Sequence, residues 1–491
     1  MAADPQSSMP HLMVVANRLP FRRLTPSDSA TTTPFSTSSS ERDTDSGPET
    51  NFDDQEWVSS PGGLVAALSP ALADISTTWV GWPGDVDTRG PNTAVVDDMQ
   101  LVIVQLDEEE KRLHYNGMSN GTLWPLFHDK VAPVEIHRSW FEGYRRVNQR
   151  FADRICEVAP PNSAVWVHDY QLMLVPAMIR QHRPDLRLGF FLHTPFPPAE
   201  LFMQLPWRNQ LIAGVLGSDL VGFQVREHVN NFARVAQQLE LATSSKRPNL
   251  THNGREVQLK AFPIGTHFSR YDEAARTPQV TELARDLRAR LGQPHTVLLG
   301  VDRLDYTKGI DVRLRAFREL LDDGRIHPSQ VAMVQVAEPS RDDVEAYVSL
   351  RSLVQQLVGE IMGDFSRLGF PVIHYLHQTH SFEELLGLYR AADVMLVTPF
   401  RDGMNLVAKE YVSTRYDDTG FLILSEFAGA ATQLKQANLI NPYDIKAVKA
   451  AIEHAVHASP LDAHGPMRAM RRTVKKHDAV AWAQSFLDAM F

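Results

Sequence analysis

The sequence predicts an α/β fold with two doubly wound parallel sheets. Two observations lead to this prediction. Short, almost uninterrupted apolar runs are typical of parallel strands that are covered on both faces, and amphipathic helical patterns separate these runs. Because the alternation continues through both halves of the 491-residue chain, it indicates two α/β domains.

The strand candidates are the apolar runs themselves. In the first half they lie at residues 12–17, 77–83, 101–106, 164–169, 186–193 and 220–224. In the second half they lie at residues 296–303, 330–337, 371–376, 394–400 and 420–427. Helical spacing is clearest at residues 342–365 and at residues 309–321, where one stripe holds Ile310, Leu314, Phe317 and Leu321. A polar stretch predicts that the chain crosses between the domains near residues 262–270.

One stretch differs from the rest of the chain. Residues 24–56 are rich in Ser, Thr, Asp and Pro and contain almost no apolar side chain. Such a stretch cannot offset its ordering entropy by burial, so we expect a flexible surface insertion. A tolerated loop and a phosphorylated regulatory segment are both compatible with this composition.

Composition excludes several functions. The formal net charge of −10 argues against nucleic-acid binding, which usually needs a basic excess. A single cysteine, Cys156, excludes an intrachain disulfide and an all-cysteine metal cluster, and its helical surroundings favour a structural thiol. With neither a signal peptide nor an apolar run of about 18 residues, we expect a cytoplasmic protein without membrane contact. Dinucleotide, P-loop and zinc-protease motifs are missing as well.

Polar residues follow several predicted strands, at the edge where doubly wound sheets bind ligands. Arg303 and Lys308 lie between strand 296–303 and the helix that begins near Gly309. Two cations beside a helix N-terminus can bind a diphosphate and stabilise charge on it as a leaving group. A surface salt-bridge cluster is the alternative.

A second group follows strand 394–400. Asp402 and Gly403 form a turn, and Gly403 permits close approach of a ligand to the backbone. A helix is expected to start near Asn405, with Leu406 and Glu410 on one face. Glu410 can accept hydrogen bonds from a ribose diol, and the helix start offers amides to phosphate. Asp402 as a simple helix N-cap is the alternative.

Two strands end on histidine. His168 and His193 follow apolar runs, and Asp169 comes directly after the first. A lone histidine at such a place is more often a cap or a core residue, but two strand ends that face one cleft favour a site.

A fourth group lies near the start of the chain. Arg18 follows the first strand, and Gly62-Gly63 start a predicted helix whose bare N-terminus can bind an anion. Tyr115 and Trp124 lie among turn residues and offer an aromatic, hydrogen-bonding surface suited to a sugar ring.

At this point the chain resembles a known family, the trehalose-6-phosphate synthases of glycosyltransferase family 20. The successive blocks of that family are matched by ANRLP, SPGGL, WVGWPG, HYNGMSNGTLWPLFH, VHDYQLMLVP, FFLHTPFP, GVDRLDYTKGI, VAEPSRDDVEAY and TPFRDGMNLVAKEYV. They run from residue 12 to about residue 441, and LDYTKG with DGMNLVAKE is the most specific pair. The insertion after Leu24 resembles the variable loop of eukaryotic, fungal-like members more than that of bacterial ones.

The resemblance implies a GT-B glycosyltransferase with two Rossmann-like domains and the active site in the cleft between them. The acceptor domain would span residues 1–265 and the nucleotide-sugar domain residues 266–475, and helix 476–491 would cross back to the first domain. UDP-glucose is expected to contact Gly62, Gly63, His193, Arg303, Lys308, Asp402, Gly403, Met404, Asn405, Leu406, Val407 and Glu410. Glucose 6-phosphate is expected to contact Arg18, Tyr115, Trp124, Asp169 and Arg341, with both arginines on its phosphate.

Family membership also implies retention at the anomeric carbon and release of UDP with α,α-trehalose 6-phosphate. A double displacement needs a carboxylate nucleophile under that carbon, and no motif supplies an obvious one. We therefore favour front-face transfer, with Arg303 and Lys308 stabilising the leaving diphosphate and with His193 and Asp402 as the other catalytic residues. These cations take the place of a divalent ion, so no metal and no cofactor is expected.

Three alternatives stay open at this level: a GT-B enzyme with another phosphorylated acceptor, a silent regulatory subunit, and a scaffold protein. The choice between UDP- and GDP-glucose is also open. As further partners we expect a second copy of the chain and a separate trehalose-6-phosphate phosphatase, because the sequence lacks the DxDx[TV] start of a phosphatase domain.

Overall fold

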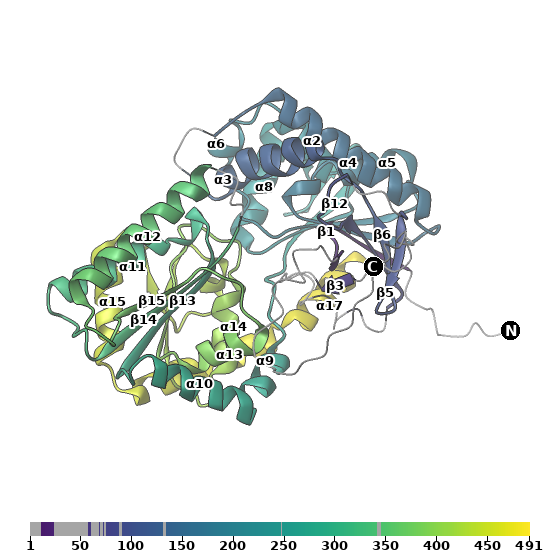
Figure 1. Cartoon of the computed structure of the whole chain (residues 1–491). Helices are drawn as coiled ribbons and strands as arrows, with labels where there is room; N and C mark the ends of the chain where they lie inside the picture. The colour runs from purple at the N-terminus through teal and green to yellow at the C-terminus, as the bar shows by residue number, and fades with distance from the viewer. Residues whose placement is uncertain are drawn as a thin grey trace, which may run out of the picture.

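The computed structural model describes residues 11–23, 57–59, 68, 72, 75–87, 91–130, 134–246, 248–340 and 345–491. Insertion 24–56 and three expected site residues, Gly62, Gly63 and Arg341, lie outside this part of the chain. Figure 1 shows two lobes, each built around one sheet with helices against its faces. No described helix is long and apolar enough to cross a membrane.

The sheet of the first lobe has ten strands in the order β10-β11-β12-β9-β8-β7-β1-β4-β6-β5. The seven strands from β12 to β6 pair in parallel, and antiparallel pairs stand at both edges. The strands are β1 Leu12–Arg18, β4 Thr77–Trp82, β5 Thr93–Val96, β6 Met99–Ile103, β7 Ala164–His168, β8 Arg187–Leu192, β9 Leu220–Phe223, β10 Thr243–Ser244, β11 Leu250–His252 and β12 Arg255–Ala261. A separate antiparallel pair joins β2 Phe21–Arg23 and β3 Trp57–Ser59.

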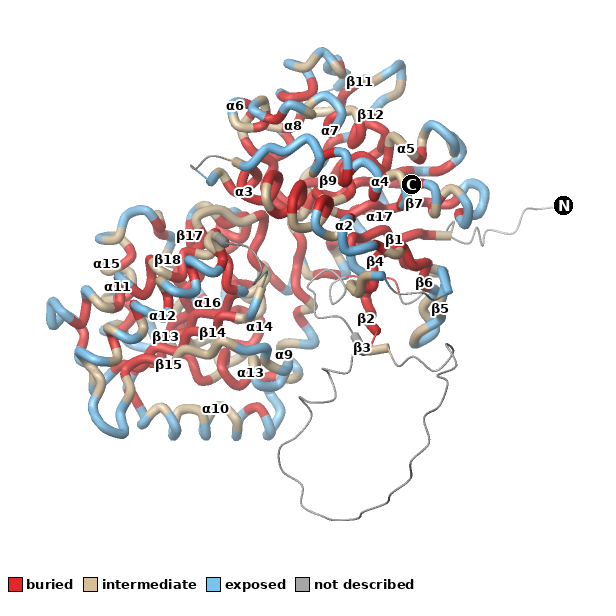
Figure 2. The backbone as a smooth tube through the Cα atoms, turned by 45° about the horizontal axis from the view of Figure 1, so that its top comes forward, coloured by how far each residue is buried: buried red, intermediate tan, exposed pale blue. Residues whose placement is uncertain are grey.

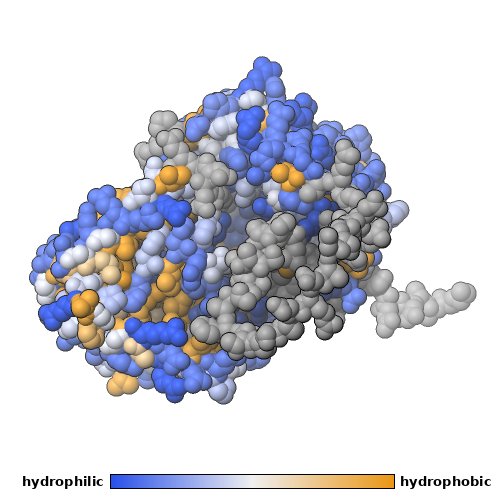
Figure 3. Space-filling model, in the orientation of Figure 1, coloured by the Kyte–Doolittle hydropathy of each residue, from blue (hydrophilic) through white to orange (hydrophobic). Residues whose placement is uncertain are grey.

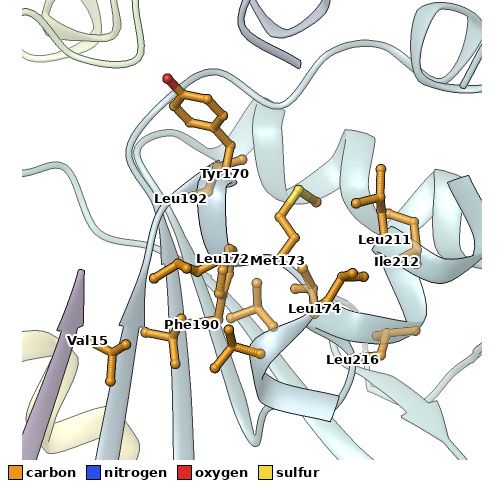
Figure 4. Packing of buried hydrophobic residues seen from close by; sticks show 14 of the residues in the cluster. Val15, Tyr170, Leu172, Met173, Leu174, Phe190, Leu192, Leu211, Ile212 and Leu216 are labelled. Atoms are coloured by element: carbon orange, nitrogen blue, oxygen red, sulfur yellow. The ribbon is translucent and has the colours of Figure 1, made fainter. Parts of the chain in front are cut away.

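Helices cover this sheet, and the longer ones bury an apolar stripe against it. They are α2 Glu108–Glu110, η4 Lys111–Leu123, α3 Trp124–Phe127, α4 Arg138–Val158, η5 Tyr170–Leu172, α5 Val175–His182, α6 Ala199–Phe202, α7 Arg208–Val215 and α8 Arg226–Gln238. Figure 4 shows the resulting core, where Phe190 and Leu192 of β8 and Leu211 and Ile212 of α7 belong to one buried cluster. Cys156 lies in α4 as expected, and it is half-buried.

The second sheet has six parallel strands in the order β15-β14-β13-β16-β17-β18. The strands are β13 Thr296–Arg303, β14 Val331–Glu338, β15 Ile373–Leu376, β16 Val394–Val397, β17 Phe421–Ser425 and β18 Asn438–Ile440. The helical segments of this half of the chain are α9 Phe268–Ala275, α10 Pro278–Arg290, η6 Tyr306–Lys308, α11 Ile310–Asp322, α12 Glu345–Phe365, α13 Phe382–Ala391, α14 Leu406–Thr414, η7 Gly429–Thr432, α15 Ile445–His457, η8 Pro460–Ala463, α16 His464–Lys476 and α17 Ala479–Met490. Figure 2 shows the strands of both sheets mostly buried, with exposed segments at the outer turns.

The chain crosses between the lobes twice, and the two crossings lie side by side. Residues 262–267 lead from β12 to α9, and the second crossing precedes α17. The amide of Ala479 donates to the carbonyl of Thr266 at 3.1 Å, and a Cβ on Gly265 would lie 2.3 Å from the backbone of Asp478. Helix α17 then contacts β8 and β9 of the first sheet. These two adjacent crossings together connect the lobes.

One expected loop is helical. Residues 111–127 contain Gly and Asn, which predict turns, yet they form η4 and α3. The reason is a contact that sequence spacing does not show. A Cβ on Gly117 or Gly121 would lie 2.7 or 2.8 Å from the Trp140 ring of α4. The glycines therefore allow this helix to lie close against α4, and tertiary packing overrides their low helix propensity.

Candidate active site

Each sheet has one switch point, where strand order reverses and doubly wound folds bind ligands. In the first sheet β1 lies between β4 and β7, and in the second β13 lies between β14 and β16. The strands at these points end at Arg18, His168 and Arg303, and Asp402 follows β16. Arg18, Arg303 and Asp402 therefore lie at or next to the switch points of the two sheets.

Lys308 and Asp402 form an ion pair at the second switch point. The Lys308 Nζ lies 2.5 Å from the Asp402 Oδ2, and their side chains are 11% and 13% exposed. The Asn405 Nδ2 donates to the same oxygen at 3.2 Å. Burial alone would raise the pKa of Asp402, but the Lys308 ammonium outweighs it, so this pKa lies below its ordinary value. The loops after β13 and β16 are thus joined by a fixed, ionised pair.

Arg303 lies at the same edge but makes a different contact. Its side chain is exposed at the end of β13, and its Cζ lies 5.8 Å from the centre of the Trp124 ring. Because Trp124 belongs to the first lobe, this contact brings one expected donor residue and one expected acceptor residue together across the two lobes.

The structure adds two details to the DGMN loop. Asn405, not Asp402, caps α14: its side chain accepts from the Ala408 amide at 3.1 Å. The bare face of Gly403 lies against the first lobe, since a Cβ there would lie 2.0 Å from the His193 carbonyl oxygen. Met404 is buried behind this contact, and Leu406 and Val407 are half-buried in the first turn of α14. Gly403 therefore lets the two lobes touch.

Glu410 lies one turn further along α14. Its Oε2 accepts from the Tyr389 hydroxyl at 2.9 Å, and Tyr271 bonds to the same carboxylate. Burial raises the pKa of Glu410, and the two phenols partly oppose that rise. The carboxylate is thus oriented by two tyrosines from α13 and α9 rather than left as a solvated helix charge.

His168 and His193 lie in contact with each other. The His168 Nδ1 lies 3.1 Å from the His193 Nε2, and the rings stack with centres 5.3 Å apart. His168 is buried against Trp166. Burial lowers the pKa of His193 to about 3 and that of His168 well below its ordinary value. Both imidazoles are therefore neutral at neutral pH.

Asp169 ties the two strand ends together. Its Oδ1 accepts from the amides of His193 and Thr194 at 3.1 and 3.4 Å. Its own backbone has a φ of +74°, a conformation that is uncommon outside glycine and that clusters at functional sites. The loop after β8 is therefore anchored by the residue expected to contact the acceptor.

Arg18 and Tyr115 lie together at the first switch point. The Arg18 Cζ lies 4.2 Å from the Trp82 ring centre and 5.8 Å from that of Tyr115. Trp124 is buried and its ring centre lies 4.0 Å from His128. The expectation that Tyr115 and Trp124 lie among turns was wrong, because they belong to η4 and α3. Helices hold these rings more rigidly than turns would.

Sequence reasoning missed several residues around the site. Tyr389 and Tyr271 hold Glu410, Trp82 stacks on Arg18, and Arg401 pairs with residues of the first lobe. Only Trp82, within WVGWPG, and Arg401, beside Asp402, stand next to a motif that could have indicated them.

Lys409 was also missed. It is buried in α14 and its Nζ donates to the Ile264 carbonyl at 2.5 Å and to the Gln433 Oε1 at 2.6 Å. Burial lowers its pKa to about 7. Because Ile264 lies in the first crossing, Lys409 links α14 to the connection between the lobes. The N-terminus of α14 is part of the candidate donor site.

Comparisons with known proteins agree with this geometry. The family model described as glycosyltransferase family 20 matches residues 32–490. The trehalose-6-phosphate synthase of Mycolicibacterium gilvum is 46% identical over 499 residues, covering 99% of this chain and 94% of its own. That of Mycobacterium leprae is 49% identical over 448 residues, covering 88% and 90%. Both organisms are bacteria, so these relatives give no support to the eukaryotic affiliation that we inferred from the polar insertion.

Solved structures are similar as well. An E. coli protein bound with UDP-2-fluoro glucose superposes with a TM-score of 0.85 at 31% identity, covering 98% of each chain. A Burkholderia xenovorans UDP-forming synthase in complex with glucose-6-phosphate gives a TM-score of 0.85 at 30% identity, covering 98% of this chain and 99% of its own. The fold is therefore GT-B, with two doubly wound Rossmann-like domains and the active site in the cleft between them. The chain belongs to glycosyltransferase family 20.

Proposed function

We propose that this chain is a trehalose-6-phosphate synthase. It transfers glucose from UDP-glucose to glucose 6-phosphate, with retention at the anomeric carbon, and releases α,α-trehalose 6-phosphate and UDP. The observation that carries the proposal is the pairing of Lys308 with Asp402 at one switch point. A leaving diphosphate and the sugar that it leaves need a cation and a hydrogen-bond acceptor side by side, and this pair provides both.

The donor binds to the second lobe. The first-turn amides of α14, at Leu406 and Val407, have no acceptor within the helix, so they can bind phosphate oxygens with the favourable end of the helix dipole. Glu410, oriented by its tyrosines, accepts the ribose hydroxyls. Gly62 and Gly63 contact the donor from the first lobe, an assignment that rests on the family resemblance.

Transfer occurs on the front face of the sugar. Asp402 holds an ion pair with Lys308 and a hydrogen bond from Asn405, which favours a role in orienting sugar hydroxyls over nucleophilic attack. Lys308 and Arg303 stabilise charge on the leaving diphosphate, whose oxygen takes the acceptor proton. His193 is neutral. It donates a hydrogen bond to the donor sugar or accepts one from it, and it carries no charge that would attract the diphosphate. No cofactor or metal ion takes part in these steps.

The acceptor binds to the first lobe. Arg18 stacks on Trp82, which fixes the plane of the guanidinium so that it can bind phosphate in a bidentate way. Tyr115 lies beside it, and Trp124 and Asp169 flank the sugar. Arg341 is the second phosphate ligand, by resemblance.

The test is UDP release with matched acceptors, glucose 6-phosphate and glucose, for the wild type and for Arg18→Ala. A charge-assisted phosphate contact contributes about 1.5–3 kcal/mol, so Arg18→Ala should lower kcat/KM for glucose 6-phosphate by about 10- to 100-fold. Glucose should be a poor acceptor for both proteins, with little difference between them. An equal loss with both acceptors would show that Arg18 does not bind the phosphate.

Further parts of the proposal rest on the sequence and on the family resemblance. They are the domain limits 1–265, 266–475 and 476–491, a homo-oligomeric state, a complex with a separate trehalose-6-phosphate phosphatase, a cytoplasmic location and no binding of nucleic acid or membrane. The eukaryotic affiliation likewise rests only on the polar insertion after Leu24.

A further inference from the structure

Arg401 makes ion pairs that join the two lobes. It lies between β16 and α14 in the second lobe, and both of its partners belong to the first. Its Nη2 lies 2.9 Å from the Glu227 Oε1, and its Nε lies 3.3 Å from the Asp129 Oδ2. Glu227 lies in the first turn of α8, and Asp129 follows α3 with a φ of +52°. We call these three residues the Arg401 bridge.

The Arg401 bridge is partly withdrawn from solvent. The arginine side chain is 13% exposed and Asp129 29%, whereas Glu227 is 59% exposed. Partial burial weakens screening by water and salt at the Arg401–Asp129 pair, whereas the Arg401–Glu227 pair also has the geometry of a hydrogen bond. A planar guanidinium is also suited to reaching two carboxylates at once, which an ammonium on a single stem does less well.

The residues next to the Arg401 bridge lie in or beside the proposed active site. Arg401 directly precedes Asp402, and two residues further on Gly403 lies against the His193 carbonyl. On the other side Lys130, next to Asp129, places its Nζ 4.2 Å from the Tyr306 ring centre. Tyr306 begins the short helix that ends at Lys308. Asp129 and Lys130 thus contact both loops that present the Lys308–Asp402 pair.

The chain segment that contains Asp129 and Lys130 also contains an expected acceptor-site residue. Asp129 and Lys130 follow Trp124 and His128 on one short segment, and those two rings are in contact. A shift of this segment away from Arg401 would therefore move Trp124 relative to Lys308 and Asp402. The face of the molecule drawn in Figure 3 is largely hydrophilic, with apolar side chains exposed mainly over the second lobe.

We propose that Arg401 is a positioning residue for glucosyl transfer: by bridging Asp129 and Glu227 it holds the lobes in the arrangement that brings Lys308 and Asp402 to the acceptor. The inference rests on the proposed function for its kinetic consequence. The bridge itself can be tested without any substrate.

The experiment is a double-mutant cycle with Arg401→Gln, Asp129→Asn and the double variant, measured on full-length protein. Loss of the bridge should lower kcat/KM for glucose 6-phosphate by about two- to fivefold, as expected for one partly buried ion pair. Either single change removes the same contact, so the double variant should lose little more than Arg401→Gln alone. Arg401→Lys should regain part of the loss.

Two readouts separate positioning from general damage. UDP binding, measured by calorimetry, should change less than twofold in Arg401→Gln, because the proposed donor contacts lie mainly in one lobe. The radius of gyration from small-angle X-ray scattering should increase. The matched control is Arg318→Gln, whose ion pairs with Glu360 and Asp364 lie within the second lobe; it should change neither the radius nor kcat/KM.

The inference would be overturned by additive losses in the cycle, by an unchanged radius of gyration in Arg401→Gln, or by an equal loss in Arg318→Gln. If the wild type forms no trehalose 6-phosphate, the proposed function fails. The scattering comparison then still decides the bridge: an expanded Arg401→Gln protein supports it and an unchanged one refutes it.

Discussion

Variants of the Lys308–Asp402 ion pair can separate its effect on turnover from its effect on the stability of the fold. Replacing Lys308 with Met keeps an unbranched side chain of similar length but removes the charge. The change leaves the Asp402 carboxylate, 13% exposed, without its cation. Two consequences follow, one for folding and one for turnover, and they respond differently to a second substitution.

Stability falls because the Asp402 carboxylate stays buried without its cation. Removing one partner of a buried ion pair costs about 3–5 kcal/mol. For a domain of this size each 1 kcal/mol lowers Tm by about 2–4 °C, so a fall of about 10 °C is expected. The catalytic cost comes from the leaving group. Removing one group that stabilises transition-state charge lowers kcat by on the order of 10²–10³.

The second substitution, Asp402→Asn, removes the charge that Lys308→Met leaves unpaired. Lys308→Met/Asp402→Asn should therefore regain most of the lost Tm, measured by scanning calorimetry. It should not regain kcat, measured by UDP release at saturating substrates. The control is Lys449→Met, whose lysine is 13% exposed and pairs with Glu319 and Asp323 away from the site; its kcat should equal that of the wild type. A Lys308→Met protein with kcat within threefold of the wild type would refute the role of this cation.

Three further predictions follow from the same contacts. Tyr389→Phe removes the 2.9 Å hydrogen bond to Glu410, so KM for UDP-glucose should rise about tenfold with kcat nearly unchanged; an unchanged KM would contradict the ribose assignment. Lys409 has a folded-state pKa of about 7, below its unfolded value of about 10.4. Between these pH values the unfolded chain binds more protons, so urea titrations should show wild-type stability rising with pH relative to Lys409→Met; a constant difference would show that Lys409 stays charged. EDTA should leave turnover intact, because Arg303 and Lys308 neutralise the leaving group; activity abolished by EDTA and restored by Mg²⁺ would reject that mechanism.

Local sequence patterns were sufficient for most of the fold. The run at residues 296–303 predicted β13 with its bounds, and the stripe of Ile310, Leu314, Phe317 and Leu321 is buried in α11. These elements were predictable because burial on both faces of a parallel strand, or on one face of a helix, leaves a periodic record in the sequence. The polar ends of the strands then indicated the edge at which a site would form.

Features that depend on contacts between distant residues were not predictable. Helix η4 exists because Gly117 and Gly121 face Trp140, and their spacing gave only a turn signal. The bare face of Gly403 lies against the His193 carbonyl, a contact that its place after a strand did not indicate. The partner of Glu410, Tyr389, is 21 residues away and lies in a helix with no motif of its own. In each case the deciding atom comes from another element, and a sequence pattern does not contain that information.

The central claim is the identity of the product, and it is tested most directly by NMR of the reaction mixture. Purified protein is incubated with UDP-glucose and glucose 6-phosphate, and the disaccharide is observed without separation. The account predicts one disaccharide phosphate in which both anomeric protons show the small coupling of α linkages, formed in equal amount to UDP. A β-linked product, or UDP release without any disaccharide phosphate, would contradict retaining transfer to glucose 6-phosphate.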